Sequence, residues 1–271
     1  MIKILSNIDS YMTFVHEVNS DPQFSEPMLS NEKQLQRNLL DAVKNPANKV
    51  LGVFIDDIIV GLFVFLILEE ESYIEMLVGL SKNEEAYAEI MQYLKRNYRG
   101  YGADFVYNPQ NHLLQKNLSN ANASFEIEQQ KMILVNDIEY KHTKEVILYH
   151  PRYKEQYIAM HNKEVYWTAE KVIDAQDRFR IILAIENDEV VGYIDITYQY
   201  DENEPYDIFV KEEHRGSGYE EAMLVKAIEL NKPRGMMLLI DVDRFSEITM
   251  YESLGFVKAE KENSITAHVV L

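Results

Sequence analysis

The chain has 271 residues, no cysteine and a formal net charge of −18, with 46% hydrophobic and 11% aromatic residues. This apolar content can bury a sizeable core, and the lack of cysteine excludes disulfides, thiolate metal sites and a cysteine nucleophile. The acidic balance repels nucleic acid and anionic membranes, so we expect neither as a partner. A cationic acceptor would be attracted, although the acidity is also explained by solubility alone.

No stretch of the sequence predicts export, a membrane span or a metal site. The first ten residues, MIKILSNIDS, contain one lysine and no small-residue cleavage site, unlike a signal peptide. The longest apolar run, at 58–68, is too short to cross a bilayer. The seven histidines are scattered without metal-ligand spacing. We therefore expect a cytoplasmic protein that binds no metal.

In chain order, the first half begins with a short strand at 2–5 and a region of two helices. A β-hairpin is predicted at 50–66, because two apolar runs flank a turn that contains aspartate. A fourth strand, a long helix at 84–96 and a fifth strand at 104–107 follow. A short helix and one or two strands close the half.

The second half repeats this order of elements. Its strands, hairpin and long helix are predicted at 145–149, 181–196, 206–210, 218–230 and 236–240. Val78, Tyr87 and Met91 each align with an identical residue 132 positions later. Chance would hardly align so many elements in order. The sequence therefore predicts two similar domains, 1–139 and 140–271, each an α+β fold with a mixed, mostly antiparallel sheet and helices on both faces.

One turn in the second half is a candidate anion site. The sequence Arg215-Gly216-Ser217-Gly218 lies between a predicted strand and the long helix. Glycines permit positive φ and close approach of a ligand, and backbone N–H groups at a helix start bind phosphate oxygens. By itself, this short pattern is also typical of an ordinary tight turn.

A second motif, Tyr251-x-x-x-Gly255-Phe256, follows the fifth strand and a short helix. Together with Arg215-x-x-Gly218 on a strand–loop–helix, it resembles the GNAT superfamily of acyltransferases. The order of elements over about 145–271 is also similar to that fold. The resemblance implies transfer of an acyl group from acetyl-CoA, or another acyl-CoA, to an amine of a small molecule or peptide.

The resemblance also implies roles for individual residues. In the family, the pantetheine arm lies where the fourth strand splays from the fifth, and the pyrophosphate binds the turn. These contacts map onto the backbone of Ile208, Phe209 and Val210 and of Arg215, Gly216, Ser217, Gly218, Tyr219 and Glu220.

The same resemblance names candidate catalytic groups. Tyr251 matches the family's usual proton donor to the departing thiolate, and Glu204 and Asp207 lie where the family often places a base. A base is needed because an alkylammonium, with a pKa of about 10, must lose a proton before it attacks a thioester. A solvated acidic edge is the alternative for Glu204. Tyr166 and Trp167 fall in the expected acceptor region, where they would stack on a cationic amine or simply pack.

The sequence also departs from the family pattern. Glu220 stands where glycine or alanine is expected, and a carboxylate turned towards a pyrophosphate would cost about 1 to 4 kcal/mol. If it turned outward, it would suit the helix dipole. Arg244 and Glu247 stand where the family tends to have asparagine and alanine.

The first half departs further. Its equivalent of the turn, at 82–87, has no glycine and two carboxylates, and no tyrosine clearly matches Tyr251. We therefore predict an N-acyltransferase, most simply an N-acetyltransferase, that acts through its C-terminal domain, with a degenerate first copy. The alternative is a non-catalytic CoA-binding or structural pair of GNAT-like domains. Monomer and homodimer are both compatible with the sequence.

Overall fold

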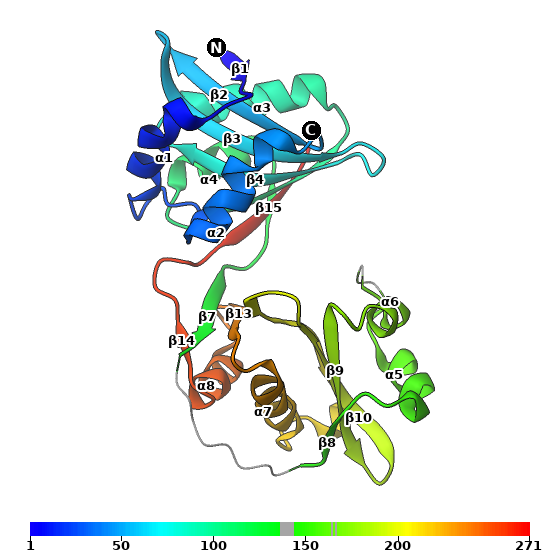
Figure 1. The fold of residues 1–271 in the computed structure, drawn as a ribbon. Coiled ribbons are helices and arrows are strands. Elements are labelled where there is room, and N and C mark those ends of the chain that lie inside the picture. Colours follow the sequence, from blue (N-terminus) through cyan, green and yellow to red (C-terminus); the bar gives the residue numbers. More distant parts are fainter. Residues whose placement is uncertain (136–143, 164, 166) are drawn as a thin grey trace. The chain divides into compact units, whose positions relative to one another are not determined.

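A computed structural model of the protein describes residues 1–135, 144–163, 165 and 167–271 (Figure 1). The predicted domain boundary between residues 139 and 140 and the candidate acceptor residue Tyr166 lie outside the described residues. The chain forms two compact units. Unit 1 comprises Met1–Gln130 and Ala259–Leu271, and unit 2 comprises Lys131–Lys258.

Unit 1 is built on a seven-stranded sheet in the order β1-β2-β3-β4-β5-β15-β6. Only β4 and β5 run parallel, and the other neighbouring pairs are antiparallel. The strands are β1 (Ile2–Ile4), β2 (Asn48–Ile55), β3 (Ile58–Leu68), β4 (Tyr73–Ser81), β5 (Gly102–Tyr107), β6 (Ser124–Phe125) and β15 (Ile265–Val270).

Helices cover both faces of the unit 1 sheet because its central strands bury alternate side chains on opposite sides. On one face, Leu51 and Phe63 pack with α3 (Glu84–Asn97) and α4 (His112–Asn120). On the other, Val50 and Leu62 pack with the short helical segments of the N-terminal region. These are α1 (Met12–Asn19), α2 (Glu32–Leu35), a π-helix (Gln36–Leu40) and 3-10 turns at Asp9–Tyr11, Pro27–Leu29 and Ala42–Lys44.

Unit 2 contains two four-stranded sheets, in the orders β12-β10-β9-β8 and β11-β13-β7-β14. The first sheet consists of β8 (Val146–Leu148), β9 (Phe179–Glu186), β10 (Glu189–Thr197) and β12 (Pro205–Val210). The second consists of β7 (Gln129–Leu134), β11 (Glu202–Asn203), β13 (Gly235–Asp241) and β14 (Phe256–Lys258). Consecutive strands β11 and β12 therefore belong to different sheets.

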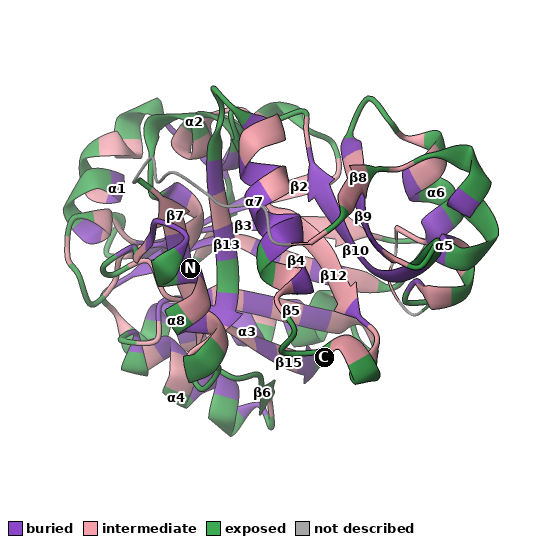
Figure 2. Cartoon of the chain, turned by 90° about the horizontal axis from the view of Figure 1, so that it is seen from below, coloured by how far each residue is buried: buried purple, intermediate pink, exposed green. Residues whose placement is uncertain are grey.

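The helices of unit 2 also lie on both faces of a sheet. Ile182 and Ile194 pack with α7 (Tyr219–Asn231) and α8 (Phe245–Ser253). Leu183 and Tyr193 point the other way and pack with α5 (Lys154–Met160) and α6 (Ala169–Asp174). Figure 2 shows buried residues along β9 and β10 and exposed residues on the outer sides of α5 and α6. The predicted α+β class with helices on both faces is confirmed.

The two hairpins share details that support the internal repeat. The turn residues Asp56 and Asp57 have φ of 47° and 62°, and Asn187 and Asp188 have φ of 51° and 65°. Positive φ at both central residues is the type I′ geometry, which matches the twist of a hairpin. In both hairpins the register also shifts just before the glycine that follows the turn, Gly61 or Gly192.

The closing strands of the two halves are exchanged between the units. Strand β15, at the C-terminus, pairs with β5 of unit 1 over Gly102–Tyr107. Strand β7, from the first half, pairs with β14 of unit 2. The compact units therefore divide the chain differently from the predicted domains 1–139 and 140–271. Both strands are short and amphipathic, so their sequence does not say which sheet each one completes.

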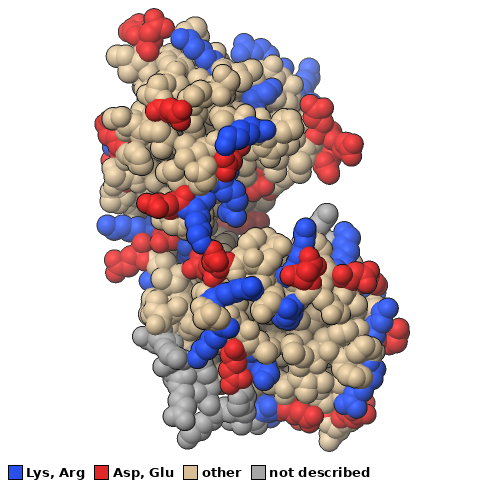
Figure 3. Space-filling view, viewed as in Figure 1, with Lys and Arg blue, Asp and Glu red and all other residues tan. Residues whose placement is uncertain are grey.

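Charged side chains of both signs are interspersed on the face drawn in Figure 3, so the net charge of −18 does not form a single acidic patch there. In the described part of the chain, no helix is long and apolar enough to cross a membrane. The same residues include no group of three or more His, Asp or Glu side chains placed to hold a metal ion.

Candidate active site

The candidate site of unit 2 lies where the chain passes from β11, which pairs with β13, to β12, which pairs with β10. Strand β11 runs parallel to β13 for two residues, with Asn203 opposite Met236, but β12 then pairs with β10. The buried Asn203 fixes this branch point, because its amide donates to the carbonyl of Tyr200 and to the side chain of Asn231 at the end of α7. Strand β12 is therefore an edge strand: one edge pairs with β10, and the other edge, which we call the open edge, pairs with no described strand.

The backbone of β12 alternates between β10 and this open edge. The amide of Lys211 donates to the carbonyl of Val191 in β10 (2.9 Å). By the antiparallel alternation, Phe209 also faces β10, whereas Ile208 and Val210 direct their backbone groups to the open edge. The Val210 carbonyl accordingly accepts a hydrogen bond from Arg215 Nε (3.2 Å). Of the three strand residues predicted to bind pantetheine, two thus present backbone groups there, and Phe209 does not.

The turn after β12 has the backbone geometry that its glycines were predicted to allow. A 3-10 turn (Glu212–His214) leads into Arg215, which is extended, and α7 begins at Tyr219. Gly216 and Gly218 have φ of 70° and 85°, a region that glycine adopts without strain. A Cβ atom added at either glycine would meet nothing within 4 Å. The turn therefore needs glycine for its conformation, and the space beside it is open.

Several backbone N–H groups at the N-terminus of α7 have no acceptor among the described residues. No side chain caps the helix, and no described residue accepts a hydrogen bond from the N–H groups of Gly216, Gly218, Tyr219 or Glu220. The Ser217 N–H is engaged, because it donates to the His214 carbonyl (3.3 Å). Free N–H groups at the start of a 13-residue helix form a favourable site for a phosphate.

The Glu220 carboxylate does not cap the N–H groups of this turn. It accepts no hydrogen bond from the turn or from any other described residue. Its pKa is raised, first by partial burial and then by the negative charge of Glu247 in α8, while Arg215 acts in the opposite direction. Glu220 therefore leaves the donors free but adds negative charge near them.

Tyr251 lies in α8 with only 6% of its surface exposed. Its ring packs edge-on against Phe256 (5.8 Å between centroids), and its hydroxyl has no hydrogen-bond partner in the described part of the chain. Burial raises the pKa of this phenol, and the charges of Glu220 and Glu247 raise it further. The hydroxyl is therefore protonated at neutral pH and can donate.

Two side chains tie the turn to strand β9. The Tyr219 hydroxyl donates to Glu186 Oε1 (2.6 Å), and His214 Nδ1 lies 3.4 Å from Glu186 Oε2. Burial and the bond to Glu186 raise the pKa of Tyr219 to about 12. The predicted contribution of Tyr219 concerns its backbone, and its side chain anchors the start of α7.

The two predicted base candidates have different surroundings. Asp207 in β12 accepts a hydrogen bond from the Tyr193 hydroxyl (2.8 Å) on the face covered by α5 and α6. Tyr251 packs on the opposite face, with α7. Glu204, at the junction of β11 and β12, is partly buried, and burial followed by repulsion from Glu202 raises its pKa. Its backbone pairs with Thr197.

An aromatic cluster lies on the same face as Asp207. The Trp167 ring packs on Phe179 (5.1 Å), which packs on Tyr206 (5.7 Å), and the Tyr206 hydroxyl accepts a hydrogen bond from the Trp167 amide. The ring of Trp167 is thus part of a packed wall beside β12.

Sequence reasoning missed four buried polar side chains next to Asp207. They are Tyr157 and His161 at the end of α5 and Tyr193 and Asp195 in β10, and all are at most 4% exposed. The signal that could have found them is Asp195, a carboxylate among the apolar and aromatic residues at 190–196 of β10.

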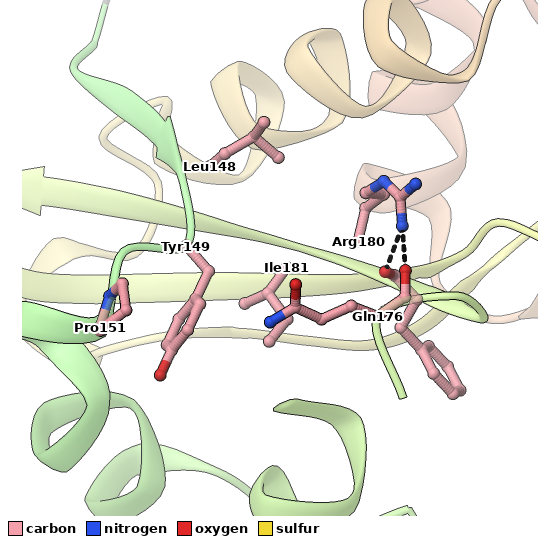
Figure 4. A pocket seen from close by; sticks show the side chains of 7 residues that line it. Leu148, Tyr149, Pro151, Gln176, Arg180 and Ile181 are labelled. Carbon is pink, nitrogen blue, oxygen red and sulfur yellow. Dashed lines mark hydrogen bonds between the residues drawn. The ribbon is translucent and has the colours of Figure 1, made fainter. Parts of the chain in front are cut away.

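A cavity of about 400 Å³ lies elsewhere in unit 2, beside β8 and β9 (Figure 4). Arg180 lines the cavity, and its guanidinium group donates to the backbone carbonyls of Gln176 and Phe179, as the dashed lines in Figure 4 show. None of the predicted site residues lines this cavity, and we assign it no part in the site.

Residues 177–258 match the model of the acetyltransferase (GNAT) domain family. No match was found among curated protein sequences. Solved structures are similar over nearly the whole chain. A GCN5-related N-acetyltransferase from Sphaerobacter thermophilus has a TM-score of 0.68 at 10% identity, over 99% of this chain and 94% of that one.

Two further structures are also similar over both units. A tandem GNAT protein from the clavulanic acid biosynthesis pathway has a TM-score of 0.58 at 11% identity, over 99% and 98% of the chains. A GNAT-family acetyltransferase from Colwellia psychrerythraea has a TM-score of 0.56 at 9% identity, over 100% of both chains. The fold is thus that of a tandem pair of GNAT-like domains, and residues 177–258 of this chain match the acetyltransferase (GNAT) domain family.

Proposed function

We propose that unit 2 is an N-acetyltransferase that moves the acetyl group of acetyl-CoA, or the acyl group of a related thioester, to a cationic amine. The observation that carries the proposal is the uncapped, glycine-containing start of α7 beside the open edge of β12. The match of 177–258 to the GNAT domain supports the same assignment.

The cofactor would bind through backbone groups. Its pyrophosphate would accept hydrogen bonds from the free N–H groups of Gly216, Gly218 and Tyr219 at the positive end of α7. Its pantetheine arm would follow the open edge of β12, where Ile208 and Val210 direct their backbone groups. A Val210 or Ile208 N–H would also suit the oxyanion of the tetrahedral intermediate.

The chemistry requires two proton movements at opposite ends of the reaction. The ammonium group of the acceptor gives one proton to Asp207, and the neutral amine then attacks the acyl carbon. As the C–N bond forms, the C–S bond breaks, and Tyr251 donates its proton to the departing sulfur. The second proton lost by nitrogen restores Tyr251 through solvent, and Asp207 returns its proton to water. Holding amine and thioester together supplies much of the rate.

Titration with acetyl-CoA, followed by thermal unfolding, tests the cofactor assignment. A ligand at 100 times its Kd stabilises the folded protein by about 2.7 kcal/mol, so we expect a clear rise in melting temperature. No rise at millimolar acetyl-CoA would reject the enzyme. A rise without acetyl transfer to any of a panel of primary amines would favour the alternative of a non-catalytic CoA-binding protein.

Tyr251→Phe tests the proton donor. We expect at least a tenfold loss of turnover with little change in acetyl-CoA affinity, because the ring packing on Phe256 is kept and only the hydroxyl is lost. Tyr98→Phe, in unit 1, is a matched control for loss of a phenol hydroxyl. Unchanged turnover in Tyr251→Phe would reject this tyrosine as the donor, though not the cofactor site.

A further inference from the structure

Asp207 is hydrogen-bonded to a buried polar cluster that the proposed chemistry does not yet use. The cluster consists of Tyr157, His161, Tyr193 and Asp195, of which three are fully buried and His161 is 4% exposed. Asp207 itself is partly exposed and lies directly opposite Asp195 in the register of β12 and β10. Two carboxylates thus sit side by side on one face of the sheet, one buried and one accessible.

The Tyr193 hydroxyl has a fixed orientation. It accepts a hydrogen bond from the backbone N–H of Asn162 (3.2 Å) and donates to Asp207 Oδ2 (2.8 Å). A phenol has one proton to give, so the Asn162 donor directs that proton to the carboxylate. The Tyr193 ring is held by stacking on His161 (5.0 Å, 10° between planes) and on Phe209 (6.0 Å).

The His161 side chain fixes the backbone that supplies this donor. Its Nδ1 lies 2.8 Å from the Asn162 carbonyl, which can only accept, so Nδ1 carries a proton. Its Nε2 lies 2.9 Å from Asp195 Oδ2, and Asp195 also accepts from the Tyr157 hydroxyl (2.9 and 2.8 Å). The imidazole therefore links α5, residue 162 and β10.

The electrostatics of this pair are compatible with its burial. Burial opposes the protonation of His161, but its bonds to Asp195 and Asn162 outweigh burial and raise its pKa. Burial raises the pKa of Asp195, while its bonds to His161 and Tyr157 act against that rise. One proton lies between His161 Nε2 and Asp195 Oδ2. Whichever of the two residues holds it, the His161–Asp195 pair is neutral overall, so no uncompensated charge is buried.

Such a cluster is a costly way to fill a core. Burying an ion pair is often no more stabilising than burying apolar side chains of similar size, and every polar atom must find a partner. The bonds described here end on the carboxylate of Asp207, which is partly exposed on the face of the sheet that α5 and α6 cover. That arrangement favours a role in orienting Asp207 over a role in stability alone.

We propose that Tyr193, held in place by the His161–Asp195 pair, is a positioning residue that orients the Asp207 carboxylate to take the proton of the acceptor amine. This inference rests on the proposed acetyl transfer. With Oδ2 bound to the phenol, Oδ1 of Asp207 is left for the ammonium group of the acceptor. The proton moves from nitrogen to Oδ1, and the phenol keeps its own proton throughout.

Kinetics with two probe amines test this role. Phenethylamine is protonated at neutral pH and needs a base, whereas aniline is not protonated and does not. With acetyl-CoA as donor, Tyr193→Phe should lower kcat for phenethylamine at least tenfold and change the aniline rate less than threefold, at an unchanged KM for acetyl-CoA. Equal losses with both amines would overturn the proposal, because a purely structural defect would affect both.

Tyr153→Phe is the matched control for Tyr193→Phe. It removes another phenol hydroxyl from unit 2, one that bonds to Asp188 in the hairpin turn, away from Asp207. We expect it to leave both rates within twofold of the wild type. His161→Gln should reproduce the selective loss with phenethylamine, since it loosens the backbone donor at residue 162.

A second measurement needs no turnover. In protein labelled with carboxyl-¹³C aspartate, the Asp207 signal is identified by its loss in Asp207→Asn. We expect this signal to shift in Tyr193→Phe and in His161→Gln, but not in Tyr153→Phe. An unmoved signal in the first two variants would overturn the positioning role, whereas failure of acetyl-CoA to bind the wild type would reject only the proposed function.

Discussion

The starts of α3 in unit 1 and α7 in unit 2 are equivalent in the repeat, yet only one is open to a ligand. Helix α3 begins at Glu84, which aligns with Gly216, so the segment that forms the turn in unit 2 is helical in unit 1. The Asn83 side chain caps α3 by accepting from the amides of Glu85 (2.8 Å) and Ala86 (3.3 Å). The donors that α7 offers to a phosphate are thus satisfied internally in α3.

The fourth strands differ in the same way. In unit 1, β4 pairs with β5 only over Tyr73–Met76. The Gly79 amide beyond that point donates to the buried Glu26 carboxylate (2.8 Å), which also accepts from the Met28 amide (3.3 Å). In unit 2, the Arg215 side chain donates to the Val210 carbonyl at the corresponding open edge of β12, and no other described residue bonds there.

The comparison teaches that two units of similar fold can treat equivalent backbone groups in different ways. A helix start and a strand edge both leave backbone groups unpaired, and these groups need a partner. Unit 1 supplies the partners from its own side chains, Asn83 and Glu26. Unit 2 leaves the N–H groups at the start of α7 without a described partner, which is the physical basis of our proposal that the cofactor binds to unit 2.

The largest effect is expected from removing the turn geometry of unit 2. Gly218→Val places a β-branched residue at φ 85°, which is strained, and puts a side chain into the open space beside the turn. We expect acetyl-CoA affinity, measured by titration, to fall more than 100-fold.

Gly100→Val in unit 1 is a matched control for Gly218→Val. Gly100 also has φ of 85°, and a Cβ there would meet nothing within 4 Å. The control should cost similar stability but leave acetyl-CoA affinity unchanged. A similar loss of affinity in both variants would mean that strain, and not the turn, accounts for the effect.

The next effect concerns the stability of unit 1 as a function of pH. Burial raises the pKa of Glu26 from its ordinary value of 4.5 to about 7, while the Gly79 and Met28 amides act against this rise. A raised carboxyl pKa favours the folded state when the group is protonated, so this contribution is lost as pH rises from about 4.5 to 7. The loss amounts to at most about 3 kcal/mol.

Urea unfolding of wild type and Glu26→Gln measures this contribution. Glutamine cannot ionise, so the difference in unfolding free energy between the two proteins should change between pH 4 and pH 8 in favour of the variant. A difference that stays constant over this range would show that the environment of Glu26 does not raise its pKa.

A smaller effect is expected from neutralising Glu220. Its carboxylate is partly buried near the free donors of α7, and the charge would oppose a pyrophosphate. Glu220→Gln should bind acetyl-CoA about tenfold more tightly. Glu221→Gln, at the exposed neighbouring position, should change affinity less than twofold. Equal affinity in the two variants would mean that the Glu220 charge is screened from the cofactor.

The smallest effect is expected from the cap of unit 1. Asn83→Ala should lower the unfolding free energy by about 1 kcal/mol, which is typical of a lost N-cap, and should not affect acetyl-CoA binding. Asn97→Ala removes the same side chain from the end of α3, where its amide donates to the Tyr93 carbonyl, and should cost less. If acetyl-CoA affinity fell in Asn83→Ala, unit 1 would have a part in the cofactor site.

Much of this architecture could be predicted from the sequence. The hairpin turns, the long helices and the order of strands follow from local apolar periodicity and from turn residues such as Asp57 and Asp188. The glycines at 216 and 218 likewise predicted a turn with positive φ, because no other residue adopts it without strain. The repeat then extended these local patterns to two units.

Other features depend on residues that are distant in the chain. The exchange of β7 and β15 could not be predicted, because either strand would satisfy either sheet by its own pattern. The cluster around Asp195 joins α5 to β10 over more than thirty residues, and no spacing rule links them. The direction of Glu220 was open in the sequence for the same reason.

The sequence by itself therefore determined the elements, their order and the chemistry that a glycine turn permits. The tertiary structure alone decided which backbone groups stay unpaired: those of α3 and β4 are taken by Asn83 and Glu26, and those of α7 and β12 are left exposed. The physical reason is that local propensities act over a few residues, whereas the partner of a hydrogen bond is fixed only when the whole chain has packed.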